Sequence, residues 1–217
     1  MRGPIRGWRT GRQRVGLVNE PSFQADLKVG RAGHGMNPQA ELDKLIGMFP
    51  GEDLLISLAE HLASAMVPEP YRGLLAHNHH MTVTMEAYYG VTVDVEVLDR
   101  QQAGEIYGRK ILLRRSDTHR VVQFGLVRFD FQYVTAAVRD EILAEKLPLG
   151  RVLINHNVLR HIDLGAVLKL TPGPQLARLF DCREKTDLYG RLATIFCNGK
   201  PAVDLLEIAA PVEIVRV

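Results

Sequence analysis

The stretch LYGRLATIFCNGKPAVDLLEIAAP, residues 188–211, contains the clearest fold signal in the chain. Two strand-like runs flank the pair Asn198-Gly199. An Asn-Gly pair in this position is the strongest short-range signal of a β-hairpin. We therefore predict two antiparallel strands joined by this turn.

The second of these strands carries two carboxylates, Asp204 and Glu207, in an otherwise apolar run. An ionised carboxylate within a strand is costly unless it is paired, solvated or used in function. Glu207 shares its face with Val203 and Leu205, but the opposite face is also mostly apolar. We expect one of the two carboxylates to face inward, and alternation alone favours neither strongly.

A second hairpin is predicted from RKILLRR and VVQFGLVRFDF, joined by residues 116–119. Alternation places Arg109 with Ile111 and Leu113 on the more apolar face of its strand. An inward guanidinium cannot lose its charge and needs an anion from the protein or from a ligand. A salt bridge, with Glu207 as a candidate partner, and a strand end open to water are the structural alternatives.

The rest of the chain predicts helices at the front and in the middle and further strands between them. Hairpins dominate and no β-α alternation occurs, which indicates an α+β fold: an antiparallel β-sheet of hairpins with helices packed on one side. No glycine-rich nucleotide motif is present. The predicted helices cover residues 38–49, 52–66, 136–146 and 172–180 and a segment from a cap at Asn78 to Gly90; the remaining strands cover 90–99 and 158–170, and 147–153 is predicted as a turn.

The charge is unevenly distributed along the 217 residues. The chain carries +2 overall, whereas residues 1–35 carry +5 and the remainder −3. We predict that residues 1–35 are a disordered basic tail or a mis-assigned start, with a functional basic arm as the alternative, and that residues 36–217 form a single domain. Basic residues do not gather on one face of the predicted helices and strands, so we predict no nucleic-acid partner.

Several chemical classes find no support in the sequence. The cluster His77, His79 and His80 lacks metal-ligand spacing, so we predict no metal. Cys182 and Cys197 form no CxxC pair and are interpreted as free thiols of a cytoplasmic protein. No apolar run approaches the roughly 20 residues of a membrane span, which predicts no membrane insertion. The kind of site that the residues still allow is a pocket for a small acidic ligand.

Four segments, in order, resemble the chorismate pyruvate-lyase (4-hydroxybenzoate synthase) family. They are HHMTVTMEAYYG with VTVDVEV, YGRKILLRR, LPLGRVL and LYGRLATIFCNGKPAVDLLEIAAP. The resemblance implies a chorismate lyase-like fold and an enzyme, a carbon–oxygen lyase that cleaves chorismate to 4-hydroxybenzoate, or a related hydroxybenzoate, and pyruvate without a cofactor, as in ubiquinone biosynthesis. Residues before Tyr71 and the long segment 165–185 depart from the family pattern.

The family's essential arginine and glutamate correspond to Arg109 and Glu207, which the resemblance makes catalytic. Arg109 would grip a carboxylate of a dicarboxylate substrate, with main-chain contacts near Met81 and Leu149. Whether Glu207 acts as base, acid or positioning group stays open. The chain is expected to be a monomer or small homo-oligomer.

Two alternatives belong to other classes. One is a non-catalytic sensor domain of the same general fold that binds a small aromatic acid. The other is a hot-dog-like acyl-thioester enzyme, for which the helix at 136–146 is short.

Overall fold

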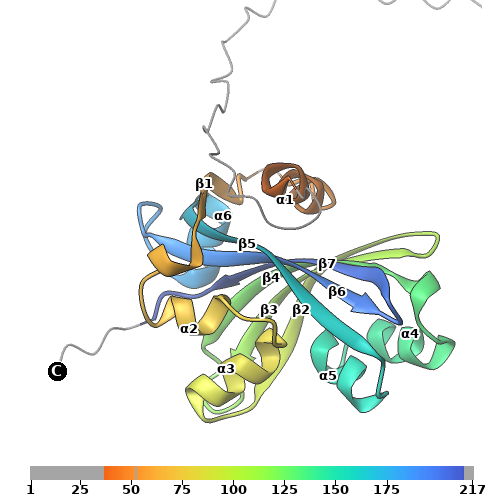
Figure 1. The fold of residues 1–217 in the computed structure, drawn as a ribbon. Coiled ribbons are helices and arrows are strands. Elements are labelled where there is room, and N and C mark those ends of the chain that lie inside the picture. The colour runs from red at the N-terminus through yellow and green to blue at the C-terminus, as the bar shows by residue number, and fades with distance from the viewer. Residues whose placement is uncertain (1–36, 52, 213–217) are drawn as a thin grey trace, which may run out of the picture.

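The structure is a computed structural model that describes residues 37–51 and 53–212. The predicted tail, residues 1–35, lies outside the described residues. Within the described part of the chain, one antiparallel sheet of seven strands forms the centre of the molecule (Figure 1). Its order is β1-β5-β6-β7-β4-β3-β2. The strands are β1 (Ile56–Leu62), β2 (Val93–Ala103), β3 (Ile106–Arg115), β4 (Val121–Asp130), β5 (Arg160–Pro172), β6 (Leu188–Cys197) and β7 (Lys200–Ala209).

Helices cover both faces of the sheet, as Figure 1 shows. Helices α2 to α5 lie on one face, and the predicted α+β fold class with an antiparallel sheet is confirmed. Helices α1 and α6 lie over the opposite face. The helices are α1 (Pro38–Gly47), α2 (Tyr71–Leu75), α3 (Met81–Tyr89), α4 (Ala136–Leu143), α5 (Leu149–Asn155) and α6 (Pro174–Phe180), with 3-10 turns η1 (Ser64–Met66) and η2 (Phe131–Tyr133).

Both predicted hairpins are present. Asn198 and Gly199 have φ values of 53° and 76° between β6 and β7, which is the backbone conformation that an Asn-Gly hairpin turn requires. The register of this hairpin changes between Ile195 and Phe196, where β7 contains one extra residue. Beyond that bulge Arg191 pairs with Glu207.

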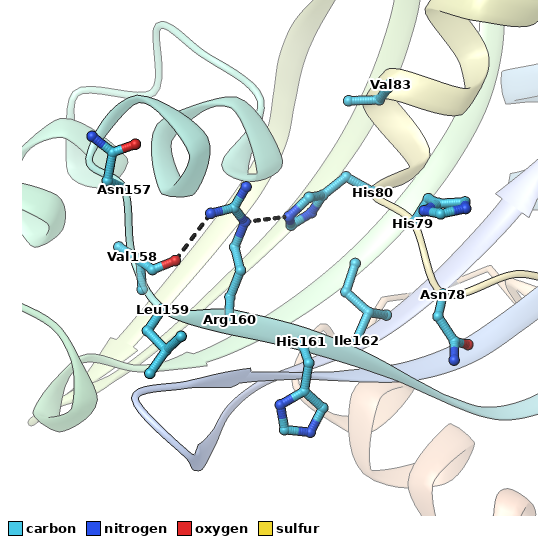
Figure 2. Close-up of a pocket in the computed structure, with 10 residues that line it drawn as sticks. All are labelled: Asn78, His79, His80, Val83, Asn157, Val158, Leu159, Arg160, His161 and Ile162. Atoms are coloured by element: carbon cyan, nitrogen blue, oxygen red, sulfur yellow. Dashed lines mark hydrogen bonds between the residues drawn. The ribbon is translucent and has the colours of Figure 1, made fainter.

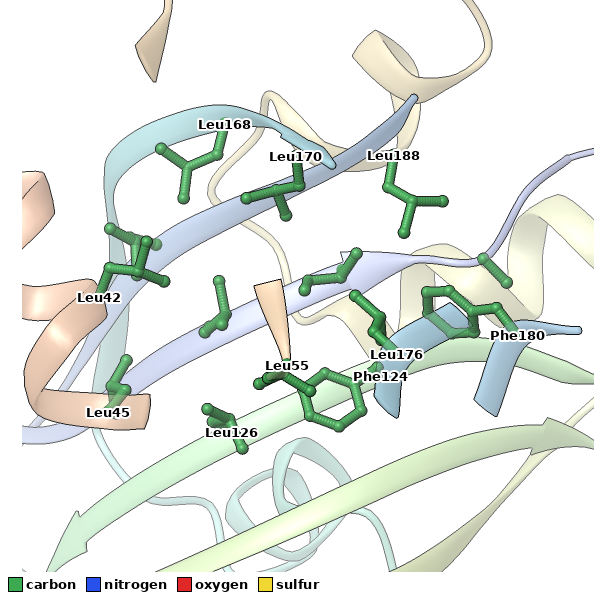
Figure 3. Packing of buried hydrophobic residues seen from close by; sticks show 14 of the residues in the cluster. Leu42, Leu45, Leu55, Phe124, Leu126, Leu168, Leu170, Leu176, Phe180 and Leu188 are labelled. Carbon is green, nitrogen blue, oxygen red and sulfur yellow. The ribbon is translucent and has the colours of Figure 1, made fainter. Parts of the chain in front are cut away.

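Alternation along the strands separates two hydrophobic layers. One layer joins Leu42 and Leu45 of α1 and Leu176 and Phe180 of α6 to the strands beneath them (Figure 3). The other two buried clusters lie on the face covered by α2 to α5. The candidate site residues considered below lie on the face covered by α2 to α5.

Three local predictions are wrong. Residues 56–62 form the edge strand β1, because pairing with β5 outweighs the helical spacing of their apolar residues. Residues 149–155 form α5 instead of a turn. Helix α3 begins at Met81, so its N-cap residue is His80 and not Asn78.

Candidate ligand-binding site

Four adjacent strands bring charged side chains to the face covered by α3 and α5. In the register of the sheet, one row across β3, β4, β7 and β6 contains Ile111, Gly125, Glu207 and Arg191. Arg109 lies two residues before Ile111 on β3 and therefore points to the same face. The inward orientation predicted for Arg109 agrees with its complete burial.

These side chains line a narrow internal cavity of ≈ 30 Å³, which we call the inner cavity. The residues predicted from the family resemblance, Arg109, Glu207, Met81 and Leu149, all contribute to its wall. Arg109 and Glu207 reach it from the sheet, whereas Met81 and Leu149 are the first residues of α3 and α5. The sheet and the two helices therefore bring residues that are up to 126 positions apart in the sequence to one small space.

Glu207 is paired with Arg191, a residue that the sequence reasoning did not select. The Nε of Arg191 donates to the carboxylate at 2.7 Å, and the guanidinium is fully buried. Its other nitrogens donate to the carbonyls of His77 at 2.8 Å and His79 at 3.0 Å. The candidate salt bridge between Arg109 and Glu207 is therefore replaced by one that ties β6 and β7 to the segment before α3.

Arg109 has no such partners. None of its three guanidinium nitrogens has a hydrogen-bond partner among the described residues, although the side chain is fully buried. Burial lowers the pKa of Arg109, and the weaker electrostatic effects of Tyr107 and Glu145 raise it. An arginine remains protonated in proteins, so this is a buried cation with unused donors.

Two further groups of the inner cavity have unused hydrogen-bonding capacity. Gln123 donates to Glu207 at 3.5 Å, and its own carbonyl oxygen has no partner in the described part of the chain. The amide orientation is set by this contact, because the opposite orientation would place two acceptors together. At the start of α3, the side chain of His80 makes no capping hydrogen bond, so the first N–H groups lack a side-chain acceptor.

A second, larger pocket adjoins the inner cavity and opens to solvent. Figure 2 shows the residues that line it. This outer pocket has a volume of ≈ 580 Å³ and is formed by residues 78–80, Val83 and residues 157–162. His80 and Ile162 line both spaces. The outer pocket and the inner cavity therefore share a wall.

His80 is hydrogen-bonded to Arg160 at this shared wall. The Nε of Arg160 donates to His80 Nε2 at 2.9 Å, and its Nη1 donates to the carbonyl of Val158 at 2.9 Å (Figure 2). Burial, followed by the charges of Arg160 and Arg191, lowers the pKa of His80 to about 4. The ring is therefore neutral near pH 7, with its proton on Nδ1.

Both ring nitrogens of His77, the first histidine of this segment, lie close to protein atoms. His77 Nε2 lies 2.7 Å from the carbonyl of Leu74, and His77 Nδ1 lies 3.2 Å from Arg191 Nη1. Residues 37–51 and 53–212 contain no group of three or more His, Cys, Asp or Glu side chains arranged to hold a metal ion. None of the helices in these two ranges is long and apolar enough to cross a membrane.

Comparison with known proteins finds similarity in structure only. No family model matches the chain, and no curated protein matches it. The ligand-binding domain of a putative GntR-family transcriptional regulator from Bordetella bronchiseptica is 15% identical, with a TM-score of 0.43 over 54% of this chain and 85% of that chain. The effector domain of PhnF from Mycobacterium smegmatis is 11% identical, with a TM-score of 0.45 over 61% and 88%. PhnF itself is 12% identical, with a TM-score of 0.43 over 79% and 93%.

The prediction of a chorismate pyruvate-lyase is therefore wrong. The similar structures reported above are domains of transcriptional regulators or a whole regulator, not lyases. The expected role in ubiquinone biosynthesis is withdrawn together with the lyase. What the chain has in common with its structural neighbours is the α+β fold.

Proposed function

We propose that this chain is a non-catalytic binding domain, a sensor for a small organic acid, in which Arg109 holds the carboxylate of the ligand. The observation that carries this proposal is the complete burial of Arg109 without a hydrogen-bond partner in the described residues. A buried guanidinium in this state is costly, and a carboxylate would supply two charge-assisted hydrogen bonds to its planar fork. The empty donors thus favour an anionic ligand.

The start of α3 supports the same ligand. The first backbone N–H groups of a helix have no intrahelical acceptor and carry a partial positive charge. Met81, at the first position of the nine-residue α3, and Leu149 both line the inner cavity. We expect the ligand carboxylate to accept from main-chain donors at Met81 as well as from Arg109, with Leu149 closing the opposite side.

Glu207 is proposed to position the binding site. Its carboxylate is paired with Arg191, whose remaining donors hold the carbonyls of His77 and His79 immediately before α3. This arrangement neutralises Glu207 and fixes the start of α3 relative to the sheet. The ion pair would therefore keep the helix end in place for the carboxylate.

The apolar walls of the inner cavity favour burial of the carboxylate of an organic acid against Arg109. Ile111, Val127 and Leu205 line the cavity beside Arg109. These side chains exclude water, which strengthens the ion pair between guanidinium and carboxylate. Aromatic monocarboxylates such as benzoate are the simplest members of this class.

The test is titration of the full chain with benzoate by isothermal calorimetry. The Arg109→Gln variant should lose at least tenfold in affinity because an amide lacks both the charge and the fork. Lys110→Gln is the matched control, since Lys110 is the next residue of β3 and points to the opposite face. Equal affinities of wild type and Arg109→Gln, with both proteins folded by circular dichroism, would contradict the proposal.

A further inference from the structure

We propose that the outer pocket holds the body of the ligand and that the hydrogen bond between Arg160 and His80 is a latch, which parts when the carboxylate passes to Arg109. This inference rests on the proposed function. It assigns a binding role to the outer pocket and a gating role to two residues. The ligand class is an organic monocarboxylate with a partly apolar body larger than its acidic group.

Volume is the first argument. The inner cavity, at ≈ 30 Å³, has room for little more than a carboxylate group. The outer pocket, at ≈ 580 Å³, is within the roughly 300–1,000 Å³ typical of small-molecule sites. A ligand whose acid is bound at Arg109 must therefore extend through the shared wall into the outer pocket.

The position of His80 identifies this residue as the barrier. His80 immediately precedes α3, and its ring packs against Gly150 of α5, where an added Cβ would lie 2.9 Å from His80 Nδ1. On the other side, His80 Nε2 accepts from Arg160 of β5. The ring thus links α3 and α5 to β5, and it lines both the outer pocket and the inner cavity. Figure 2 shows the ring facing Arg160.

The chemistry of the latch suits reversible opening. Arg160 donates to a neutral ring and to the carbonyl of Val158, and the described residues give it no carboxylate partner. Breaking this bond separates no ion pair, and the side chain of Arg160 is partly open to solvent. A water molecule or a ligand atom can replace the ring as acceptor.

The lining of the outer pocket defines the body that it would accept. Val83, Leu159 and Ile162 provide apolar surface, and Asn78 and Asn157 provide hydrogen-bonding groups. No aspartate or glutamate lines the outer pocket, whereas Arg160 does. A neutral or anionic, flat, partly apolar body fits this lining, and a cationic body does not.

Affinity across a series of acids tests where the body lies. Acetate, benzoate and biphenyl-4-carboxylate share one acidic group and differ in the size of the body. We expect the affinity to increase by at least threefold at each step. A larger body makes more contact with the outer pocket, and the opening to solvent leaves room for it. Val83→Trp on the exposed surface of α3 should weaken biphenyl-4-carboxylate at least tenfold and acetate less than twofold.

Association kinetics by stopped flow test the latch. His80→Ala removes the acceptor and leaves Arg160 in place, so the association and dissociation rates of benzoate should both increase about tenfold. The matched control is His61→Ala on the exposed side of β1, which lines neither the outer pocket nor the inner cavity; its rates should stay within twofold of wild type. Unchanged rates in His80→Ala would overturn the gating role.

The outcomes separate this inference from the proposed function. Benzoate binding that requires Arg109, combined with rejection of biphenyl-4-carboxylate and no effect of Val83→Trp, would overturn the outer pocket alone. Absence of binding by all three acids would overturn both. Tight binding of biphenyl-4-carboxylate by Arg109→Gln would show that the outer pocket is a site of its own and would contradict the link between the two spaces.

Discussion

Arg109 and Arg191 are both fully buried on the same face of the sheet, but their surroundings differ in a way that assigns them different tasks. Arg191 is saturated by Glu207 and by two main-chain carbonyls. Arg109 has no hydrogen-bond partner in the described residues. A saturated buried arginine supports the structure, whereas an unsaturated one costs stability and is available for a ligand.

Replacing Arg109 by methionine should make the ligand-free protein more stable. Methionine has a similar length and no charge, so the change removes an uncompensated buried cation, and we expect the free energy of unfolding to rise by roughly 1–3 kcal/mol. The same variant should fail to bind benzoate. Urea unfolding without ligand gives the stability and calorimetry gives the binding.

Arg191→Met is the matched control, because it removes the partner of Glu207 and leaves a buried carboxylate unpaired. This change should lower the free energy of unfolding by about 3–5 kcal/mol. A decrease in stability for Arg109→Met as well would show that Arg109 is compensated in the absence of ligand.

The pH dependence of stability should depend on His80. The unfolded chain protonates this histidine near pH 6.5, whereas burial holds the pKa of the folded state at about 4. Between these values the unfolded state binds more protons, so stability falls as the pH falls from 6.5 to 4. Replacing His80 by glutamine should make this decrease in stability shallower. Above pH 7, where His80 is neutral in both states, the replacement should not change the pH dependence of stability.

Chemical denaturation at pH 7.5, 6 and 5 measures the effect, and NMR titration of the ring locates the pKa itself. His77 also has a pKa lowered by burial, so part of the decrease should persist in the variant. A His80 ring that titrates near pH 6.5 in the folded protein would contradict a buried, neutral ring that accepts a hydrogen bond from Arg160.

At the level of elements, the contact between β1 and the start of α6 depends on a glycine. The N–H of Gly173 donates to the carbonyl of Leu55 at 2.9 Å, and a Cβ at Gly173 would lie 2.2 Å from the carbonyl oxygen of Leu54. Because that atom belongs to the backbone, Gly173→Ala must displace the chain before β1. We expect a loss of about 2 kcal/mol or more in the free energy of unfolding.

Gly47→Ala provides the comparison for this change. A Cβ at Gly47, in the last turn of α1, would have no atom within 4 Å. Alanine there should stabilise the protein by about 0.5–1 kcal/mol because it favours the helix. Thermal unfolding of both variants distinguishes a local clash from a general effect of the glycine-to-alanine change.

The elements also show what local sequence signals could and could not predict. The Asn198-Gly199 hairpin and the inward face of β3 follow from turn chemistry and alternation, and both are present. A two-residue turn alone would pair Arg191 with Leu206, on the face away from the inner cavity. The bulge in β7 shifts the pairing to Glu207, and this is why the partner of the glutamate could not be found from the sequence.

The misassignments have a similar origin. The segment that forms β1 has apolar residues at helical spacing, and only its pairing with the distant β5 makes it a strand. Helix α5, which supplies Leu149 and Gly150, is seven residues long and has no side-chain N-cap, so the sequence contains little to indicate it. The sequence could therefore predict that Arg109 faces the candidate site and that a helix ends at Gly90, but not the facing of Glu207 or the presence of α5.

At the scale of the whole molecule, the sheet separates a face that carries the candidate site from a face that contributes to stability. The layer beneath α1 and α6 is mainly hydrophobic, with Lys44 of α1 paired to Asp204 of β7 at 2.8 Å, whereas the charged residues of the inner cavity lie beneath α3 and α5. Leu45 on α1 and Leu205 on β7 represent the two faces and are 1% and 5% exposed. Substitutions on the two faces should consequently differ in their effect on binding.

Leu45→Ala and Leu205→Ala should both lower the free energy of unfolding by about 2–5 kcal/mol, because each removes a buried leucine side chain. Leu205 lines the inner cavity, so its truncation should change benzoate affinity at least threefold, whereas Leu45→Ala should leave affinity within twofold. Calorimetry measures the benzoate affinity at 10 °C, a temperature chosen to keep both variants folded. Urea unfolding gives the stability of each variant. Equal changes in affinity would mean that the sheet transmits packing on the α1 face to Arg109, and the two faces would then have to be treated as one cooperative unit.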